Sequence, residues 1–584
     1  MSILGRWNHW RHDRMDEVRL HLSKPDALLQ QAVLGCISGL IAGGVIILFR
    51  FIVEGTQDSI LPGEGPENYE ALHGLWRFVL PISGSLLLAV IFWRFSKGIQ
   101  VLGVARVLER LAYHQGRLTT REFLLQFFGA AIAIISGHSV GREGPHVHLG
   151  AASGSLLGQK LGLPNNSIRI LAGCGVAAGI AASFNTPLAG VVFALEVVMM
   201  EYTVISFTPI ILAAVSATVL SNVVLGGEPA FSVPPLALGS LKELPVVLAL
   251  GFFGGVVSAG FIHLLKTVAE RSKGLQIWWR IILAGGIVGL LAWQIPEIMG
   301  IGYDSIDRAL LGQFGAGILV ILLVVKIVAT SASVGLGIPG GMIGPALFIG
   351  AIFGSLVGIS AEYLYPESES LIGFYALLGM GAVMGASLQA PLAALVAMLE
   401  LTHNPGIILP GMLAVVIAGL TASELFHKES LFVTMLKASG LDYNHNPMVQ
   451  LLRRAGVASL MNTNFDKVDE RISPDHAERL LNEGIEWLLI RDEEKPVYLL
   501  PAVDLAKYIR SFDSGSEEHI DLLEIPARRY QIAAVHLQAT LQEAYEIFDE
   551  GTAEALYIER MTVPGIWRTY GVLTKEMVDS AYRY

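Results

Sequence analysis

The feature that most constrains this chain is a series of apolar stretches, each long enough to cross a bilayer. They lie at residues 29–53, 76–96, 205–226, 245–266, 279–295 and 315–332. A hydrocarbon core of about 30 Å requires about 20 apolar residues in helical form. Only 16% of the residues are charged, whereas a soluble chain carries about 25%. We therefore predict a polytopic membrane protein, which excludes a wholly soluble enzyme, a disulfide-built secreted domain and a disordered chain.

The acidic charge of the chain belongs to its C-terminal part. The net charge is −11, and residues 438–584 carry 15 Lys and Arg against 25 Asp and Glu, whereas the preceding residues carry 25 against 26. A low charge content is what a chain shows when most of its segments lie in hydrocarbon. We therefore predict a nearly neutral membrane domain followed by a soluble, acidic one.

Two further stretches, 121–200 and 335–424, are apolar but broken by Gly, Pro, Ser or Asn. Non-helical backbone at membrane depth is stable only where it is buried in protein or lines an aqueous cavity. Paired broken segments in two halves of a chain indicate a transport site. These two are copies at an offset of about 200 residues, with shared pairs that include Gly141/Gly341, Gly144/Gly344, Pro145/Pro345, Gly150/Gly350, Gly154/Gly354, Pro187/Pro391 and Glu196/Glu400. The alternative is a glycine repeat that serves only helix packing, but packing does not need the shared Gly-Pro break.

The repeated Gly-x-x-Gly-Pro sequence predicts a helix N-terminus that binds an anion. Proline suits the first helical position, and the backbone N–H groups before it lack helical partners. Those donors and the positive end of the helix dipole attract negative charge. We therefore assign Gly141, Arg142, Gly144 and Gly344 to an anion site. Arg142 and Lys326 are the basic residues within the apolar runs, and we interpret Lys326 as a helix-end side chain that reaches toward the membrane surface.

Glu143 is the strongest single candidate for a functional residue. A carboxylate within a membrane segment is costly and functional by default, and this one lies at the predicted helix start. Ionised, it competes with the anion for the site, and protonated, it leaves. We predict a gate that responds to protons. The alternative is a helix-start glutamate paired with Arg142.

At these motifs the chain resembles the CLC family of chloride channels and chloride/proton exchangers, over about residues 28–440. The resemblance rests on the sequences at 141–145, 341–345 and 184–190. It implies an all-α membrane domain of two inverted repeats with broken helices, a homodimer, and one anion pathway per subunit. It also implies that the backbone N–H groups of Met342 and Ile343 coordinate the central anion and that Glu143 is the extracellular gate.

Three positions depart from the family pattern. Leu102 stands where a serine hydroxyl would face the anion, and a shifted alignment places Ile99 there instead. Phe432 occupies the position at which a tyrosine usually supplies a hydroxyl. Val197 takes the place of the inward-facing glutamate of the exchangers, next to Glu196. An aliphatic side chain takes up no proton, so we favour channel-like or weakly proton-coupled conduction.

The alternative within this class is a stoichiometric chloride/proton antiporter, with Glu143, Glu196 and Glu201 as its possible proton path. A distant alternative is a divalent-cation transporter with CBS domains. We expect no metal site, because His138, His146 and His148 have no Cys or Asp to complete a ligand set; we interpret them as polar residues near a pathway mouth. We expect no enzyme either, because no nucleophile and base or metal set is present, and the glycines of 335–340 are no dinucleotide fingerprint, since they lie in a membrane stretch.

The soluble tail contains a second repeat. A capped helix over 473–484 leads into an apolar strand at 487–490, and 541–551 leads into 555–558 in the same way. This pattern resembles a tandem CBS pair, which often binds adenine nucleotides. Pro501 and Met577 each replace one nucleotide-contacting residue. We therefore favour a structural role for the pair and expect no cofactor other than chloride as the transported ion.

We predict the following domain limits: an N-terminal cytoplasmic helix over 1–26, the membrane domain over 27–440 with repeats at about 27–226 and 245–440, and a small α/β domain over 448–584 with CBS motifs at about 456–512 and 524–584. The first 26 residues contain no apolar segment, so no cleaved signal peptide is expected. The expected location is a plasma membrane, the bacterial inner membrane, with both termini cytoplasmic. The expected partners are lipid, a second copy of the chain, chloride or related anions and, for the antiporter alternative, protons, without nucleic acid.

Overall fold

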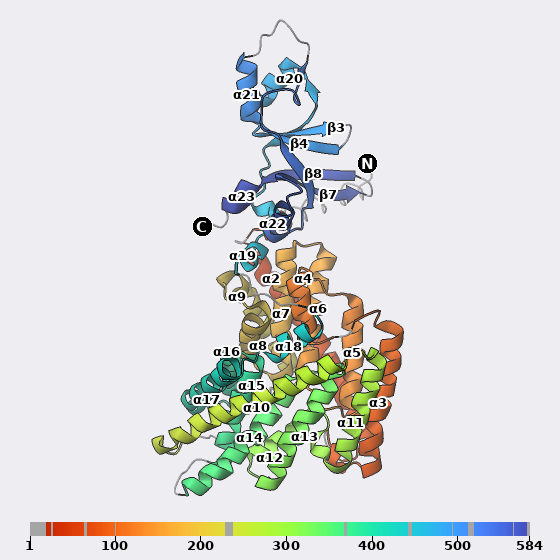
Figure 1. Cartoon of the computed structure of the whole chain (residues 1–584), viewed down its shortest axis with the longest axis vertical. Helices are drawn as coiled ribbons and strands as arrows, with labels where there is room; N and C mark the ends of the chain where they lie inside the picture. Colours follow the sequence, from red (N-terminus) through yellow and green to blue (C-terminus); the bar gives the residue numbers. More distant parts are fainter. Residues whose placement is uncertain are drawn as a thin grey trace. The chain divides into compact units, whose positions relative to one another are not determined.

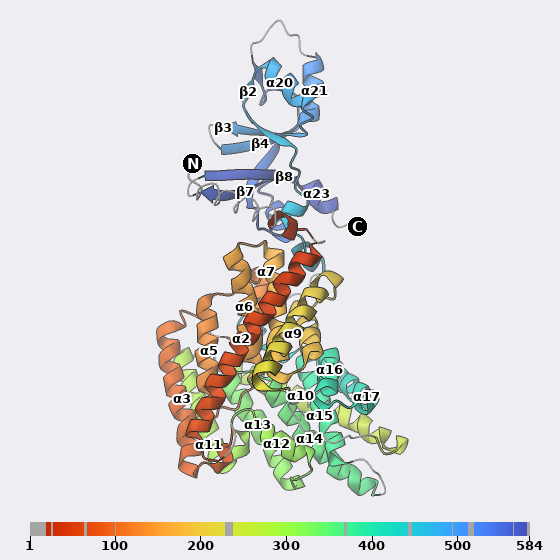
Figure 2. The same cartoon turned by 180° about the vertical axis from the view of Figure 1, so that it is seen from behind.

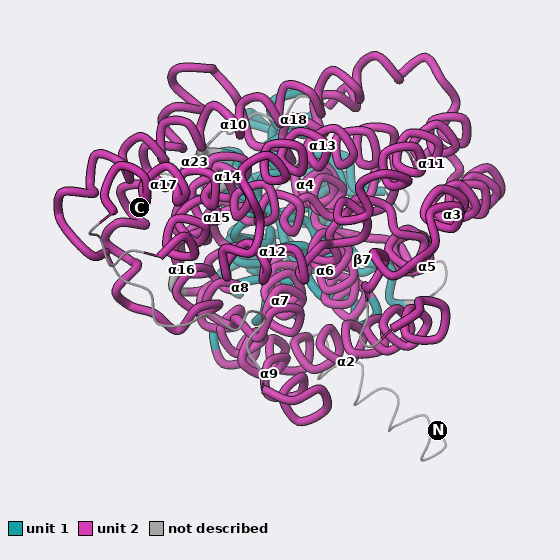
Figure 3. The backbone as a smooth tube through the Cα atoms, turned by 90° about the horizontal axis from the view of Figure 1, so that it is seen from below, with its two compact units in different colours: residues 1–28, 160–167, 445–584 teal, residues 29–159, 168–444 magenta. Residues whose placement is uncertain are grey.

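The computed structural model describes residues 19–24, 27–63, 67–99, 101–227, 238–366, 371–441, 447–492, 495–511, 519–563 and 566–580. The predicted N-terminal helix over 1–26 lies largely outside these residues, and within it residues 19–22 are helical. The chain divides into two compact units, coloured separately in Figure 3. One comprises residues 29–159 and 168–444, and the other comprises residues 1–28, 160–167 and 445–584.

The first of these, which we call the membrane unit, is built from helices (Figure 1). Its first half contains α2 (Leu28–Ile60), α3 (Gly74–Phe95), α4 (Val104–Tyr113), α5 (Thr120–Ile135), α6 (Glu143–Leu161), α7 (Asn165–Phe184), α8 (Pro187–Phe193) and α9 (Val204–Leu225). Its second half contains α10 (Leu244–Arg271), α11 (Ile277–Gln294), α12 (Tyr303–Leu310), α13 (Ala316–Gly335), α14 (Ile343–Leu364), α15 (Ile372–Leu388), α16 (Pro391–Thr402), α17 (Ile408–Leu420) and α18 (Leu431–Ala438).

Among the described residues, nine helices are long and apolar enough to cross a membrane. They include the six apolar stretches found in the sequence, and they add Asn165–Phe184, Ile343–Leu364 and Pro405–Leu425. The fully buried Asn165–Phe184 span belongs to one of the broken stretches, and shorter apolar helices such as Pro391–Thr402 flank such spans. The prediction of a polytopic helical membrane domain with broken helices is therefore confirmed.

Glycines set how closely the helices of each repeat approach. A Cβ added to Gly154 on α6 would lie 1.9 Å from the Leu171 carbonyl oxygen on α7. The matching Gly354 on α14 would place a Cβ 2.2 Å from the Tyr375 carbonyl oxygen on α15. Small residues let membrane helices pack backbone against backbone. The same contact thus recurs in both halves, as the sequence repeat requires.

Helix α2 packs on α9 by the same means, and the two run side by side in Figure 2. A Cβ on Gly35 or Gly39 would lie 2.5 Å or 2.2 Å from the carbonyl oxygens of Pro209 and Ala213, respectively. A shared set of glycine contacts therefore joins the first and last helices of the first repeat.

The second unit contains an α/β domain. Its elements are α19 (Pro447–Arg453), β1 (Phe465–Asp469), β2 (Arg471–Ile472), α20 (Pro474–Asn482), β3 (Trp487–Asp492), β4 (Lys495–Pro501), α21 (Ala502–Ser511), β5 (Ile520–Asp521), β6 (Tyr530–His536), α22 (Leu541–Asp549), β7 (Ala555–Val563), β8 (Ile566–Thr574) and α23 (Lys575–Ser580). Its larger described sheet has the strand order β1-β3-β4-β6-β7-β8. Each half of that sheet pairs two strands in parallel and adds a third antiparallel strand.

The helices of this domain begin where the sequence places their caps. The Ser473 hydroxyl accepts the His476 N–H at 3.3 Å, and Pro474 occupies the first turn of α20. Thr540 and Glu543 form a capping box at the start of α22. Each half follows the order strand, strand, helix, strand, strand, helix. The predicted internal repeat and the α/β class of the tail are confirmed, and the arrangement is the one expected of a tandem CBS pair.

Candidate functional site

The glycine signatures of the two repeats meet inside the membrane unit. The Gly141 N–H donates to the Gly341 carbonyl at 2.8 Å, and the Gly341 N–H donates to the Gly141 carbonyl at 2.7 Å. The two residues form an antiparallel bridge. A Cβ on Gly144 would lie 2.7 Å from the Gly341 Cα. Direct backbone contact between the repeats therefore explains why glycine stands at these positions.

Glu143 of the first repeat lies at the start of a helix of the second repeat. Its side chain is fully buried, and its Oε2 accepts the Gly344 N–H at 3.1 Å at the N-terminus of α14. Its Oε1 accepts the hydroxyl of Tyr303 on α12. A Cβ on Gly141 would lie 2.2 Å from Oε2. The carboxylate therefore occupies the position at which free N–H groups and a helix dipole favour negative charge.

Met342 and Ile343 lie at the same helix start. Met342 is the N-cap residue of α14, and Ile343 is its first residue. Neither position has an intrahelical acceptor for its N–H. Both side chains are buried, with 5% and 2% exposure. The structure thus brings together Glu143, Gly344 and the two residues that the family resemblance assigns to the anion.

The Arg142 side chain pairs with a different carboxylate. Its Nη1 pairs with Glu54 on α2 at 2.9 Å, and its guanidinium lies 5.1 Å from the centre of the Tyr303 ring. The predicted alternative pairing of Glu143 with Arg142 is therefore not formed as a direct ion pair. Tyr303 was not found by sequence reasoning, because a tyrosine in a short helix between apolar spans carries no distinguishing motif.

The interpretation of Lys326 as a surface-reaching side chain is wrong. Lys326 is fully buried in α13, and its Nζ lies 4.5 Å from the centre of the Phe348 ring. It donates to the backbone carbonyls of Ile298, Gly300 and Ile301 at 3.1, 3.2 and 3.3 Å. These carbonyls belong to the segment between α11 and α12, which includes a short 3-10 helix over Pro296–Ile298. They take the place of the water that the buried ammonium would otherwise need.

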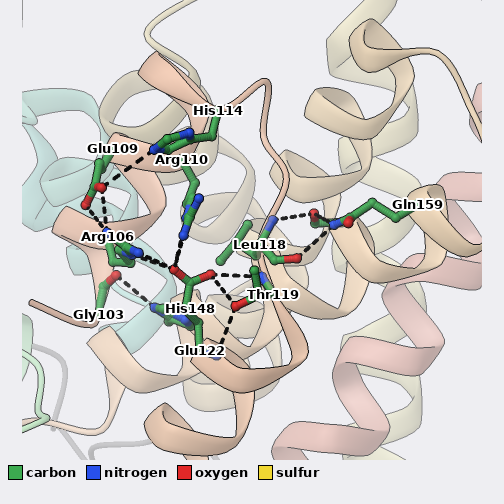
Figure 4. A network of polar contacts seen from close by, with 11 residues as sticks. Gly103, Arg106, Glu109, Arg110, His114, Leu118, Thr119, Glu122, His148 and Gln159 are labelled. Carbon is green, nitrogen blue, oxygen red and sulfur yellow. Dashed lines mark hydrogen bonds and ion pairs between the residues drawn. The ribbon is translucent and has the colours of Figure 1, made fainter. Parts of the chain in front are cut away.

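Leu102 lies directly before Gly103, whose positive φ of 72° starts α4. The Gly103 N–H donates to Gln126 Oε1 at 2.7 Å, and its carbonyl accepts from His148 Nδ1 at 3.2 Å. Figure 4 shows His148 pointing toward Gly103 from α6. The start of α4 is thus held by α5 and by the same helix that begins with Glu143.

The arginines of α4 form the second part of the network in Figure 4. Arg106 and Arg110 both pair with the fully buried carboxylate of Glu122 on α5. Glu122 also accepts the Thr119 N–H at 2.8 Å. These charges are satisfied by one another, so they fix the helix rather than offer free cations to a ligand.

Phe432 and Ile99 are two further positions at which the chain departs from the family pattern. Phe432, in the first turn of α18, is 1% exposed, and its ring meets that of Phe193 edge to face at 6.3 Å. Ile99 lies in the loop before Leu102 and is half-buried. Neither side chain offers a hydrogen-bond donor. Any anion in this region therefore depends on backbone donors or on charges from elsewhere.

Glu196 and Glu400 each cap the N-terminus of a helix in the opposite repeat. The Glu196 carboxylate accepts the N–H groups of Leu392 and Ala393 at 3.1 and 2.7 Å, at the start of α16. The Glu400 carboxylate accepts those of Leu188 and Ala189 at 2.9 and 2.7 Å, at the start of α8. This exchange was not foreseen, because the partners lie about 200 residues apart. Each carboxylate neutralises a helix N-terminus.

Glu201 and Val197 lie near Glu196 but differ in their surroundings. Glu201 is 8% exposed and accepts the Ser206 hydroxyl at 2.9 Å. Val197 is 4% exposed and belongs to the apolar core. The predicted possible proton path thus has one carboxylate at Glu143, one on the start of α16 and one beside Ser206.

The three histidines are not at an open mouth. His138, His146 and His148 are all fully buried. Their ring nitrogens hydrogen-bond to Ser85 at 3.0 Å, Ser183 at 2.8 Å and Gly103 at 3.2 Å, respectively. Within the described ranges, no group of three His, Cys, Asp or Glu side chains could hold a metal ion.

The fold and this site define a membrane transport protein in which two repeats of broken helices meet at paired N-termini. Residues 84–423 match the family described as voltage gated chloride channel. The chain therefore belongs to this family, the CLC family.

The relatives agree with this assignment. The H(+)/Cl(-) exchange transporter ClcA of Vibrio campbellii is 30% identical over 426 residues, which cover 70% of this chain and 89% of that protein. ClcA of Vibrio cholerae is 33% identical over 324 residues, 53% of this chain and 69% of that one. A ClcB-like protein of Ralstonia nicotianae is 33% identical over 356 residues, 59% of this chain and 82% of that one.

Solved structures share the fold. A slow cyanobacterial Cl-/H+ antiporter matches with a TM-score of 0.61 and 23% identity, over 70% of this chain and 97% of that one. A eukaryotic CLC transporter matches with a TM-score of 0.60 and 19% identity, over 94% of this chain and 98% of that one. The second match extends over nearly the whole length of both chains.

Proposed function

We propose that this protein carries chloride across the membrane, with the anion held by helix N-termini and the path gated by Glu143. The observation that carries the proposal is the hydrogen bond from the Gly344 N–H to the Glu143 carboxylate at the start of α14. An ionised carboxylate and an anion compete for the same donors and the same positive helix end. Protonation removes the charge of Glu143, so the carboxyl group leaves and an anion enters.

Channel-like or weakly proton-coupled conduction is the mode we favour. Stoichiometric exchange needs a titratable relay from Glu143 to the opposite side. Val197 supplies no such group, and the Glu196 carboxylate is engaged by two backbone N–H groups of α16. The second candidate is a stoichiometric chloride/proton antiporter, which is favoured by the names of the two ClcA relatives.

Purified protein in liposomes distinguishes the two modes. Chloride efflux and external pH are recorded together, with a chloride gradient as the sole driving force. The favoured mode predicts chloride efflux with little or no proton movement against a proton gradient. Proton uptake in a fixed ratio to chloride, continuing uphill, would establish the antiporter instead.

A CBS-bearing divalent-cation transporter is the distant alternative. Such a site would need several oxygen ligands in the membrane. Among the residues that the structure describes, none of the acidic side chains group with two others in a metal-binding arrangement. Magnesium or manganese flux through the same liposomes would support this alternative, and its absence alongside chloride flux would exclude it.

A homodimer is part of the proposal. It is implied by the family resemblance, and α9 and α17 each present a row of exposed apolar side chains that could meet lipid or a second copy: Phe207, Val215, Val219, Leu409, Met412, Val416 and Leu420. Light scattering of the detergent-solubilised protein tests it. A mass of two chains supports the dimer, and a mass of one chain excludes it.

We further propose that both termini are cytoplasmic in a bacterial inner membrane and that the CBS pair is structural. Pro501, in β4, and Met577, in α23, take the places of nucleotide-contacting residues. Fusion of a reporter active only in the cytoplasm to the C-terminus tests the orientation. Calorimetry with ATP tests the CBS pair, for which no heat of binding is expected.

A further inference from the structure

Lys326 is a buried cation on α13 that holds the turn between α11 and α12. Its Nζ donates to the carbonyl oxygens of Ile298, Gly300 and Ile301 at 3.1, 3.2 and 3.3 Å. An ammonium group has three donor hydrogens and no acceptor, so these three carbonyls satisfy it. The carbonyls in turn need a donor, because a buried polar group without a partner is costly. The backbone at 298–301 is therefore folded around the Lys326 ammonium.

Phe348 lies against the same cation. Its ring centre is 4.5 Å from the Lys326 Nζ, and its side chain is fully buried in the second turn of α14. The face of an aromatic ring attracts an ammonium group. Lys326 thus joins the turn before α12 to α14, the helix whose N-terminus holds the Glu143 carboxylate.

Two glycines in the left-handed region give this turn its shape. Gly300 and Gly302 have φ values of 58° and 84°, which other residues rarely adopt. A Cβ on Gly302 would lie 2.9 Å from the Phe348 ring and 3.4 Å from the Lys326 Nζ. The glycines therefore let the backbone lie close to both the ring and the ammonium.

The turn leads directly into Tyr303, the first residue of α12. The Tyr303 hydroxyl donates to Glu143 Oε1. Ile301, within the turn, lies beside the same site, because a Cβ on Gly344 would be 3.0 Å from the Ile301 Cγ2. The turn therefore supplies the hydroxyl that binds the gate and a side chain that packs at the start of α14.

We propose that Lys326 is a positioning residue: it holds the turn at 298–302 so that the Tyr303 hydroxyl meets the Glu143 carboxylate. Without the ammonium, the three carbonyls lose their donor and the turn relaxes. The hydroxyl then no longer stabilises the ionised carboxylate, which takes up a proton at higher pH and leaves the α14 terminus. The effect on flux rests on the proposed function, whereas the effect on the turn does not.

The charge of Lys326 offers a second route to the gate. The acidic groups whose charges act on Lys326 come from the segment before α3, from α12 and from the start of α6: Glu67, Glu70, Asp304 and Glu143. Arg142 on α6 is a further cation whose charge acts on Glu143. A nearby cation favours the ionised form of a carboxylate even without direct contact. The test must therefore separate the position of Tyr303 from the charge of Lys326.

The experiment records chloride efflux from liposomes over a range of pH, and hydrogen exchange over residues 298–306 of the same protein. Lys326→Gln removes the charge, whereas Phe348→Leu removes the ring and leaves the charge. Both should move the pH of half-maximal flux upward, Lys326→Gln by about one unit, and both should keep the flux reached at the acidic limit. Lys326→Arg keeps a charged donor and should restore most of the parent profile. Lys266→Gln is the matched control, because Lys266 is half-exposed and pairs with Glu270 at 3.9 Å.

A double-mutant cycle with Tyr303→Phe separates position from charge. If Lys326 acts through the Tyr303 hydroxyl, Lys326→Gln adds little further shift once that hydroxyl is absent. A shift as large in the Tyr303→Phe background as in the parent protein would overturn the proposal, because it would identify a long-range effect of charge. Phe348→Leu should lose its shift entirely in this background, and it decides the question if Lys326→Gln does not fold.

Hydrogen exchange distinguishes a failure of this proposal from a failure of the proposed function. Lys326→Gln and Phe348→Leu should both exchange faster over residues 298–306, and Lys266→Gln should match the parent protein. Exchange that is unchanged in both variants would overturn the role of Lys326, whatever the flux. A parent protein that carries no chloride would refute the proposed function, and the exchange result would still decide whether Lys326 holds the turn.

Discussion

At the scale of single residues, the protein places a removable negative charge where its transported anion is expected to bind. Glu143 comes from one repeat, and the Gly344 N–H that it accepts comes from the other. The Tyr303 hydroxyl donates a hydrogen bond to the other carboxylate oxygen of Glu143. The sequence predicts the gate from one acidic residue in an apolar motif, but it cannot predict Tyr303, because the contact spans 160 residues and depends on how the halves meet.

The first prediction concerns the charge of this carboxylate. Glu143→Gln keeps the size of the side chain but removes its ability to ionise, so chloride flux should lose its dependence on pH. Flux at neutral pH should rise at least several-fold over the parent protein. Glu270→Gln removes an exposed acid and should leave the flux at neutral pH and its pH dependence unchanged. A pH dependence that persists in Glu143→Gln would refute the gate.

The second prediction concerns the hydroxyl of Tyr303. Tyr303→Phe removes the donor to Glu143 Oε1 while it keeps the ring beside Arg142. A hydrogen bond to a charged group contributes about 1.5–3 kcal/mol, so the ionised carboxylate should leave the α14 terminus more readily. Flux at neutral pH should therefore increase in liposomes. A decrease would mean that the hydroxyl serves the anion and not the gate.

At the scale of elements, the repeat explains both the helix packing and the crossed caps. The sequence reveals the repeat through its shared Gly-Pro breaks, and these are the points at which Gly141 and Gly341 pair. It does not reveal that Glu196 caps α16 while Glu400 caps α8. The aligned glutamates are visible as a repeat, but their partners depend on the three-dimensional crossing of the halves.

The third prediction tests these caps. Glu196→Gln and Glu400→Gln each leave one acceptor oxygen and remove the charge at a helix N-terminus, which should lower stability by about 1–2 kcal/mol. The melting temperature in detergent should fall by a similar amount in both variants, because their contacts match. A loss of proton coupling in Glu196→Gln without a loss of stability would identify Glu196 as part of a proton path.

The fourth prediction tests the glycine contacts between helices. Gly154→Ala would place a methyl group 1.9 Å from the Leu171 carbonyl oxygen, so α6 and α7 must separate and the melting temperature should drop markedly. Gly260→Ala in α10 meets nothing within 4 Å, and it should be neutral or stabilise by about 0.5–1 kcal/mol. Equal melting temperatures for the two variants would contradict the role of close packing.

At the scale of the whole molecule, a short segment from the first repeat belongs to the same compact unit as the tail. Residues 160–167 lie in that unit. The Asn165 Nδ2 donates to Glu543 at 3.0 Å, and the Asn165 N–H donates to the Gln538 carbonyl at 2.9 Å. Charge and hydropathy separate a membrane domain from an acidic tail, but they cannot assign the eight residues at the junction of α6 and α7 to a unit that resumes nearly 300 residues further along the chain.

The fifth prediction concerns this segment. Asn165→Ala removes the side-chain bond to Glu543, which also caps α22. Hydrogen exchange should increase over residues 160–167 and at the first turn of α22, because the hydrogen bond between Asn165 and Glu543 joins these two segments. Asn482→Ala, at an exposed position on α20, should leave both segments unchanged. Unaltered exchange in Asn165→Ala would show that the backbone bonds alone hold the segment.

The central claim is that an anion and the Glu143 carboxylate share the N-terminus of α14. The most direct measurement is anomalous diffraction from crystals of the parent protein and of Glu143→Gln, both grown with bromide. We predict a bromide peak within hydrogen-bond distance of the Gly344 N–H in the variant, at the position of the carboxylate oxygen in the parent protein. A variant with no bromide at that helix start, in crystals that bind bromide elsewhere, would contradict the account.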